Sequence, residues 1–234
     1  MHADLLALET QLARRHRTRE SEVVVGTRTI TLVHPASADE LISEVEFDAD
    51  GRLPYWADLW PSARVLAAHV VALPGRGRRL LELGCGAGLV ATAAAFAGFE
   101  VTASDYYQDA CAFARLNAWR ATGDVIATRL LDWRHLSADL GTWDVVVASD
   151  VLYEMPYAAL VAEVLDRTLA PGGVAIIADP GRMALESFVA ACRTRGLEPG
   201  EPEPVPYDFD GQRQTIRVFT IRRVRALTAP TPTP

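Results

Sequence analysis

The chain has 234 residues, half of them hydrophobic and 23% charged, and its net charge is −7 at neutral pH. This length allows one large α/β domain or two small ones, and either can bury its own core. The acidic balance argues against a general nucleic-acid binder, because neutralising phosphates requires a basic surface. No apolar run approaches the ~18 residues that a membrane-spanning helix requires.

All 23 basic residues are arginines, which excludes chemistry that needs a lysine, such as a Schiff base or a phosphate-loop lysine. The three cysteines, Cys85, Cys111 and Cys192, are widely spaced and form neither a metal-binding pattern nor a disulfide framework. The N-terminus lacks the apolar stretch of a signal peptide. We therefore expect a cytoplasmic protein that uses no metal and binds neither membranes nor nucleic acid.

Several short elements precede the first core strand. They are, in chain order, an amphipathic helix over 4–16, a β-hairpin over 22–33, a helix start at the capping-box pair Ser37 and Glu40, an aromatic segment over 54–61, and a helix over 62–73. We expect residues 1–61 to form an N-terminal cover packed on a core of residues 62–225. Residues 226–234 alternate Pro and Thr, which predicts a disordered tail.

From residue 79 onward, strand and helix patterns alternate, which indicates a parallel sheet with helices on both faces. The expected strands cover 79–83, 100–104, 125–130, 144–148 and 174–178, and the expected helices cover 89–97, 108–120, 157–169 and 184–195. Two further strands, 205–209 and 215–222, flank Asp210-Gly211, which is a hairpin turn signal. The sheet is therefore expected to end in an antiparallel hairpin.

The first core strand runs into a glycine-rich turn, and the second strand ends in Asp105. In the turn, Glu82 is followed by Gly84, Gly86 and Gly88 at two-residue spacing. Glycines let the backbone turn sharply and approach a ligand closely. A carboxylate at the tip of the second strand suits the hydroxyls of a ribose. The pair predicts an adenosine-bearing cofactor, although Asp105 is also placed to cap the following helix.

The spacing of the turn distinguishes between such cofactors. A dinucleotide fingerprint requires a further glycine where this chain has Leu89, and Glu82 beneath the turn disfavours a pyrophosphate. A carboxylate there suits the ammonium group of S-adenosylmethionine (SAM), whose product is S-adenosylhomocysteine (SAH). We expect SAM and a Rossmann-like, seven-stranded methyltransferase sheet, mostly parallel, with the C-terminal hairpin antiparallel and helices on both faces.

Further motifs strengthen this interpretation through a resemblance. They are PYWADLWP at 54–61, LELGCG at 81–86, LDW at 131–133, and ASDVLYE at 148–154. These motifs resemble the class I SAM-dependent methyltransferases and, among them, the family-16 protein lysine methyltransferases. The bacterial branch of this family is similar to the electron-transfer-flavoprotein β-subunit lysine methyltransferases. The segment ADPGR at 178–182 also resembles that branch. The resemblance covers residues 22 to 223.

The resemblance implies roles for individual cofactor-binding residues. Glu82, Gly84, Gly86 and Gly88 shape the pocket for the methionine part of SAM, and Asp105 takes the ribose hydroxyls. The other cofactor candidates are Asp132 and Trp133 at the adenine, Trp60 on the N-terminal side, Ser149 beside the methyl group, Cys85 inside the turn, and Tyr106 after Asp105.

The resemblance also implies two catalytic candidates. Asp150 and Tyr153 form a D-x-x-Y element that is expected to face the acceptor nitrogen, and Asp150 follows a central strand at the end where open α/β sheets bind ligands. A carboxylate raises the pKa of a nearby ammonium, so positioning the acceptor is a stronger interpretation than general-base catalysis. Loop capping by Asp132 or Asp150, core packing by Trp60 or Trp133, and helix packing by Tyr153 are the structural alternatives.

These observations predict a SAM-dependent N-methyltransferase that modifies a protein lysine side chain and is a monomer or a weak oligomer. A small-molecule N- or O-methyltransferase on the same fold is the first alternative, because the cover and the loops select the acceptor. A SAM-binding module without catalysis is a second alternative. The intact D-x-x-Y element argues against that module.

Overall fold

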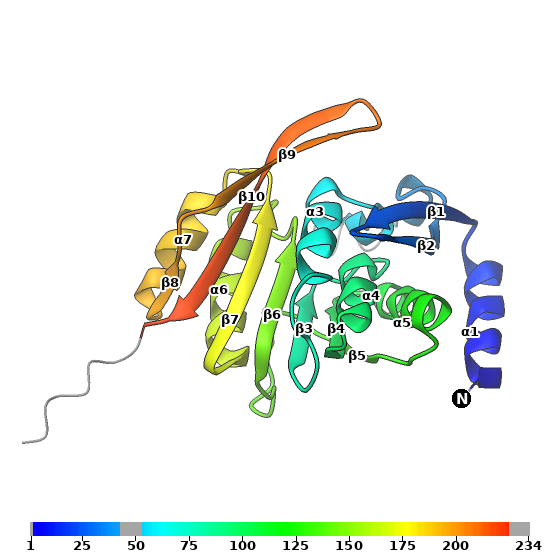
Figure 1. The fold of residues 1–234 in the computed structure, drawn as a ribbon, viewed down its shortest axis with the longest axis horizontal. Helices are drawn as coiled ribbons and strands as arrows, with labels where there is room; N and C mark the ends of the chain where they lie inside the picture. Colours follow the sequence, from blue (N-terminus) through cyan, green and yellow to red (C-terminus); the bar gives the residue numbers. More distant parts are fainter. Residues whose placement is uncertain (1, 43–52, 225–234) are drawn as a thin grey trace, which may run out of the picture.

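The computed structural model describes residues 2–42 and 53–224, and its centre is a single mixed sheet (Figure 1). The strands of this sheet are β3 (Arg79–Leu83), β4 (Glu100–Asp105), β5 (Ala127–Leu130), β6 (Trp143–Ser149), β7 (Leu169–Asp179), β8 (Leu197–Pro199), β9 (Glu203–Phe209) and β10 (Gln212–Arg223). The helices around it are α3 (Pro61–Val70), α4 (Leu89–Phe96), α5 (Gln108–Thr122), α6 (Tyr157–Thr168) and α7 (Leu185–Thr194). The expected core elements are thus confirmed, with ends shifted by a few residues.

The strand order is β5-β4-β3-β6-β7-β10-β8, and β9 also pairs with β10. Strands β3 to β7 run parallel to one another, whereas β10 runs antiparallel to β7. Both β8 and β9 pair with β10, in successive stretches. Ile221 of β10 faces Pro199 of β8, and Val218 of β10 faces Glu203 of β9, so the two registers differ by one residue. They act as one interrupted edge strand, so the expected seven-stranded arrangement is confirmed. The three-residue β8 was missed because it is too short to show a period.

The central strands of the sheet, such as β6, are buried on both faces, as expected for parallel strands with helices on each side. Side chains on one face, such as Leu80 of β3, pack in a core with α3 and α4. Side chains on the other face, such as Leu81 of β3, pack in a second core with α6 and α7. The loops at the carboxyl ends of the strands are therefore free to form a site.

The N-terminal elements pack beside the sheet. Helix α1 (His2–Arg15) leads into β1 (Thr18–Val25) and β2 (Arg28–Pro35), which form a separate two-stranded sheet. The expected helix and hairpin are confirmed, and both contact α5 (Figure 1). The side chain of Asn117 in α5 is buried and holds β2 by accepting the Val33 N–H at 2.8 Å and donating to the Val33 carbonyl at 2.8 Å.

The capping-box expectation was only partly right. The Ser37 hydroxyl accepts the Asp39 N–H at 3.1 Å, and Asp39–Leu41 form one 3-10 turn. Glu40 does not reach back to the backbone at residue 37, because its carboxylate pairs with Arg17. The rest of the expected helix and the tail at 226–234 lie outside the described residues. No described helix has the length and apolar character needed to cross a membrane.

Candidate cofactor and acceptor site

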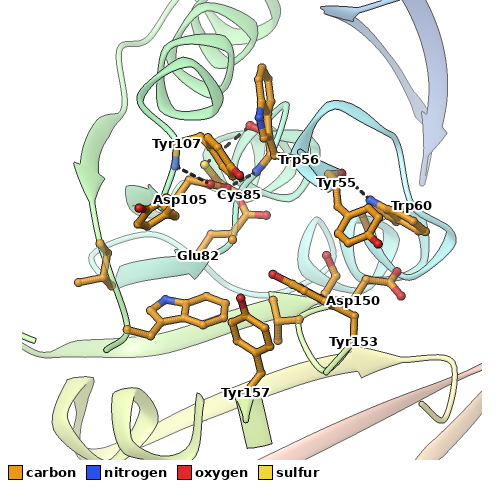
Figure 2. Close-up of a pocket in the computed structure, with 18 of the residues that line it drawn as sticks. Tyr55, Trp56, Trp60, Glu82, Cys85, Asp105, Tyr107, Asp150, Tyr153 and Tyr157 are labelled. Atoms are coloured by element: carbon orange, nitrogen blue, oxygen red, sulfur yellow. Dashed lines mark hydrogen bonds between the residues drawn. The ribbon is translucent and has the colours of Figure 1, made fainter. Parts of the chain in front are cut away.

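A cavity of about 310 Å³ lies at the carboxyl ends of β3, β4 and β6, beneath the aromatic segment (Figure 2). The predicted site residues that line it are Trp60, Glu82, Gly84, Cys85, Gly86, Asp105, Tyr106, Asp132, Trp133, Ser149, Asp150 and Tyr153. Gly88 does not line the cavity. A Cβ atom on Gly88 would lie 2.4 Å from Ala114 Cα, so this glycine allows α4 to pack closely on α5.

The aromatic segment closes over the glycine-rich turn. Gly86 has a φ of +49°, and a Cβ atom there would lie 2.8 Å from the carbonyl oxygen of Trp56. The turn 55–57 can therefore approach the backbone of the loop only because residue 86 is glycine. The indole of Trp60 donates to the Tyr55 carbonyl at 2.8 Å, which fixes the far end of this segment.

Asp105 ties the glycine-rich turn to the end of β4. Its two carboxylate oxygens accept the Gly86 N–H and the Tyr107 N–H, each at 3.0 Å. Burial raises the pKa of Asp105, and these hydrogen bonds partly oppose that effect. The N-cap of α5 is Tyr107, so the structure does not support capping by Asp105. A carboxylate with two N–H partners retains lone pairs that can accept hydroxyl groups of a ribose.

Glu82 is the most deeply buried acidic group of the cavity. Its side chain is 2% exposed, and its Oε2 atom has no hydrogen-bond partner among the described residues. Burial raises its pKa well above the ordinary value, a hydrogen bond from the Ala91 backbone partly opposes this, and the neighbouring Asp105 charge adds to the rise. A buried carboxylate oxygen without a partner is costly unless a ligand supplies a donor. The residues therefore fit the ammonium group of SAM.

The residues expected at the adenine differ in their surroundings. Trp133 packs beside Gly84, and its buried indole N–H lacks a partner within the described part of the chain. The carboxylate of Asp132 instead binds the Arg134 N–H at 3.0 Å, the Arg134 guanidinium at 3.0 Å and His135 at 3.1 Å. Asp132 thus caps its own loop, which was the structural alternative for this residue.

Asp150 is held in a fixed orientation at the end of β6. Its φ is +56°, an unusual value for a residue other than glycine and one that is often found at functional sites. One carboxylate oxygen accepts Arg182 Nη2 at 2.8 Å, and the other accepts the Ser62 N–H at 3.2 Å. Asp150 therefore caps the N-terminus of α3 rather than its own loop.

Arg182 was not predicted as a site residue, although a sequence signal for it exists. After β7, Asp179 Oδ1 accepts the N–H groups of Gly181 at 2.7 Å and Arg182 at 2.8 Å, and this turn directs the chain back toward the sheet. Asp-Pro-Gly is a typical turn sequence. Because β7 lies next to β6, the turn brings Arg182 beside Asp150.

Aromatic rings form a continuous wall along the cavity (Figure 2). Ring centroids are 5.9 Å apart for Trp60 and Tyr55, 5.4 Å for Tyr55 and Tyr153, 4.6 Å for Tyr153 and Tyr157, and 5.8 Å for Tyr157 and Trp133. Burial and the neighbouring Tyr157 raise the pKa of Tyr153, so its hydroxyl is protonated at neutral pH. Tyr55 and Tyr157 were not selected from the sequence, because single aromatic residues are more often core than site.

The sheet order, the glycine-rich turn after β3 and the carboxylate after β4 together define a class I methyltransferase fold. Solved structures agree with this assignment of the fold. A SAM-dependent methyltransferase structure from Streptococcus mutans matches with a TM-score of 0.59 and 17% identity, over 86% of this chain and 55% of that one.

The lysine methyltransferase family model matches residues 48–189, and the chain belongs to this family. The electron transfer flavoprotein beta subunit lysine methyltransferase of Xenopus laevis is 33% identical over 141 residues, which are 57% of this chain and 55% of that protein. A ubiquinone biosynthesis O-methyltransferase of Alkalilimnicola ehrlichii is 32% identical over 106 residues, 45% of this chain and 43% of that protein. The chain thus spans about half the length of these curated relatives.

Proposed function

We propose that this protein is a SAM-dependent N-methyltransferase that transfers a methyl group to a protein lysine side chain. The observation that carries the proposal is the buried Glu82 Oε2 atom, which has no hydrogen-bond partner in the described part of the chain and lies in the cavity of a fold from the lysine methyltransferase family. The Xenopus laevis relative is named for the beta subunit of electron transfer flavoprotein, so that subunit is the first acceptor to test. We place the enzyme in the cytoplasm as a monomer or weak oligomer.

In this proposal, each cofactor-binding residue has one task. Glu82 binds the ammonium group of SAM, Asp105 binds the ribose hydroxyls, and Trp133 packs on the adenine. When bound, SAM supplies a methyl group that is bonded to a sulfonium. The sulfur is therefore already activated to leave as the thioether of SAH. The protein therefore contributes orientation and the exclusion of water. Residues 1–61 serve as the cover for these tasks, and residues 62–225 serve as the cofactor-binding core.

The acceptor nitrogen must be neutral, since an ammonium group has no lone pair with which to attack carbon. Asp150, oriented by Arg182 and the Ser62 N–H, stabilises the positive charge that develops on the nitrogen during transfer. The protonated hydroxyl of Tyr153 forms a hydrogen bond with the acceptor, orients it and excludes water. Positioning of the amine is the stronger interpretation of Asp150, and general-base catalysis is the weaker one.

The test uses methyl-tritiated SAM and a cell extract that is separated into protein and small-molecule fractions. Half of the protein fraction is acetylated beforehand so that its lysines are blocked. The enzyme itself contains no lysine, so methyllysine in the products cannot come from self-modification. We expect label in the untreated protein fraction and its loss after acetylation. Asp150→Ala should bind SAH normally, by calorimetry, and transfer no label.

The second candidate function is methylation of a small molecule, which the likeness to the O-methyltransferase of Alkalilimnicola ehrlichii favours. In that case the label would appear only in the small-molecule fraction. Such a result would contradict the proposal for lysine and leave the assignment of SAM intact.

A further inference from the structure

A second cavity, of about 590 Å³, lies on the outer side of Trp60 and Asp150. It is bounded by β1, by the start of α3 and by the β9–β10 hairpin. In Figure 1 the β9–β10 hairpin projects beyond the carboxyl ends of β6 and β7, and the β1–β2 hairpin lies on the other side of α3. Asp58, Leu59, Trp60 and Asp150 line both cavities. These four residues therefore form the boundary between the outer cavity and the cofactor cavity, which we call the passage.

The two acidic residues of this passage differ in their partners. Both carboxylate oxygens of Asp150 are engaged, one by Arg182 and the other by the Ser62 N–H. The Asp58 carboxylate has no hydrogen bond or ion pair to any residue in the described ranges 2–42 and 53–224, although its side chain is half-buried. Burial raises the pKa of Asp58, and the more distant Arg19 charge partly opposes this. Among the described residues, Asp58 is thus the acidic group of the passage whose carboxylate oxygens have no partner.

The half-buried Asp58 carboxylate, without a partner among the described residues, favours a cationic ligand with several N–H donors. The ring of Trp60, which also lines the passage, already has the Arg182 guanidinium over it, with Cζ 5.4 Å from the ring centroid, so the attraction for a cation here comes from Asp58. A lysine side chain has a long apolar stem and an ammonium group at its tip, and it enters from outside. The outer cavity has room for the residues that flank such a side chain.

We propose that Asp58 binds the ammonium group of the acceptor lysine in the passage between the two cavities, before the nitrogen reaches Asp150 and Tyr153. This inference rests on the proposed function and adds a binding residue to it. No bond is made or broken at Asp58. The role is recruitment, because a carboxylate stabilises the charged form of the amine and the charged form does not react.

The test compares Asp58→Asn, an isosteric change, with Asp139→Asn, which makes the same change of charge at an exposed loop position. Initial rates of tritium transfer from labelled SAM are measured against the concentration of the desalted protein extract. Loss of a charge-assisted hydrogen bond predicts a KM for extract protein about 10- to 100-fold higher in Asp58→Asn, with kcat within about threefold. Asp139→Asn should match the wild type.

Two further measurements separate binding of the acceptor from a structural role. The affinity for SAH and the melting temperature of Asp58→Asn should equal those of the wild type, because the carboxylate has no partner to lose within residues 2–42 and 53–224. Asp58→Ala should show the same rise in KM. An unchanged KM, or a rise that appears only together with weaker SAH binding or a lower melting temperature, would overturn the role of Asp58 and leave the proposed function standing. Failure of the wild type to label protein would overturn both.

Discussion

Replacing Asn117 by alanine removes the side chain that joins the N-terminal hairpin to the glycine-rich turn. Asn117 is fully buried, and its amide bonds to the Val33 N–H and carbonyl, each at 2.8 Å, and to the Ala87 carbonyl at 2.9 Å. Alanine leaves these three backbone groups without that partner. A buried backbone group left unpaired costs about 1–3 kcal/mol, so for three groups we expect a loss of roughly 3–9 kcal/mol in the free energy of unfolding.

The assay is urea unfolding followed by fluorescence and circular dichroism. With a slope of about 2 kcal/mol per molar urea, the midpoint should fall by roughly 1.5–4.5 M. Thr122→Ala is the matched control, because it removes a hydrogen-bonding side chain at the part-buried end of the same helix. Its midpoint should change by about 0.5 M or less. Equal midpoints for the two variants would refute the view that Asn117 holds the cover on the core.

Three further predictions concern the site. Asp105→Ala should weaken SAH binding by about 10- to 100-fold in calorimetry, and unchanged affinity would remove the ribose assignment. Burial raises the pKa of Glu82 from an ordinary value of 4.5, so its contribution to stability is largest below pH 4.5 and is lost as pH rises toward the raised pKa. The ammonium group of SAH should lower the pKa of Glu82, so that SAH binding releases a proton from this carboxyl group. The release can be measured by calorimetry in buffers of different ionisation enthalpy. Equal proton release from Glu82→Gln would contradict the pairing. Arg182→Gln should destabilise the fold by about 3 kcal/mol, because it leaves Asp150 buried without its ion-pair partner. Adding Asp150→Asn should restore much of that stability. Additive effects of the two substitutions in thermal unfolding would exclude coupling between them.

The sequence by itself determined the features that depend on neighbouring residues in the chain. The alternation of apolar strands and helices identified the sheet, because burial on both faces requires apolar residues throughout each strand. The turn after β3 was recognisable because positive φ values demand glycine there, as at Gly84 and Gly86. Asp210-Gly211 likewise marked the terminal hairpin, with φ values of +53° and +75°.

Tertiary structure alone decided which side chains share the site and which of their atoms remain free. Asp150 and Arg182 are 32 residues apart in the chain, and only the pairing of β6 with β7 brings them together. Asp58 had no distinguishing pattern in the sequence, because whether a carboxylate has a partner depends on groups from distant segments. Local conformational preference can be inferred from adjacent residues, but the partners of a buried polar group become defined only when the chain is packed.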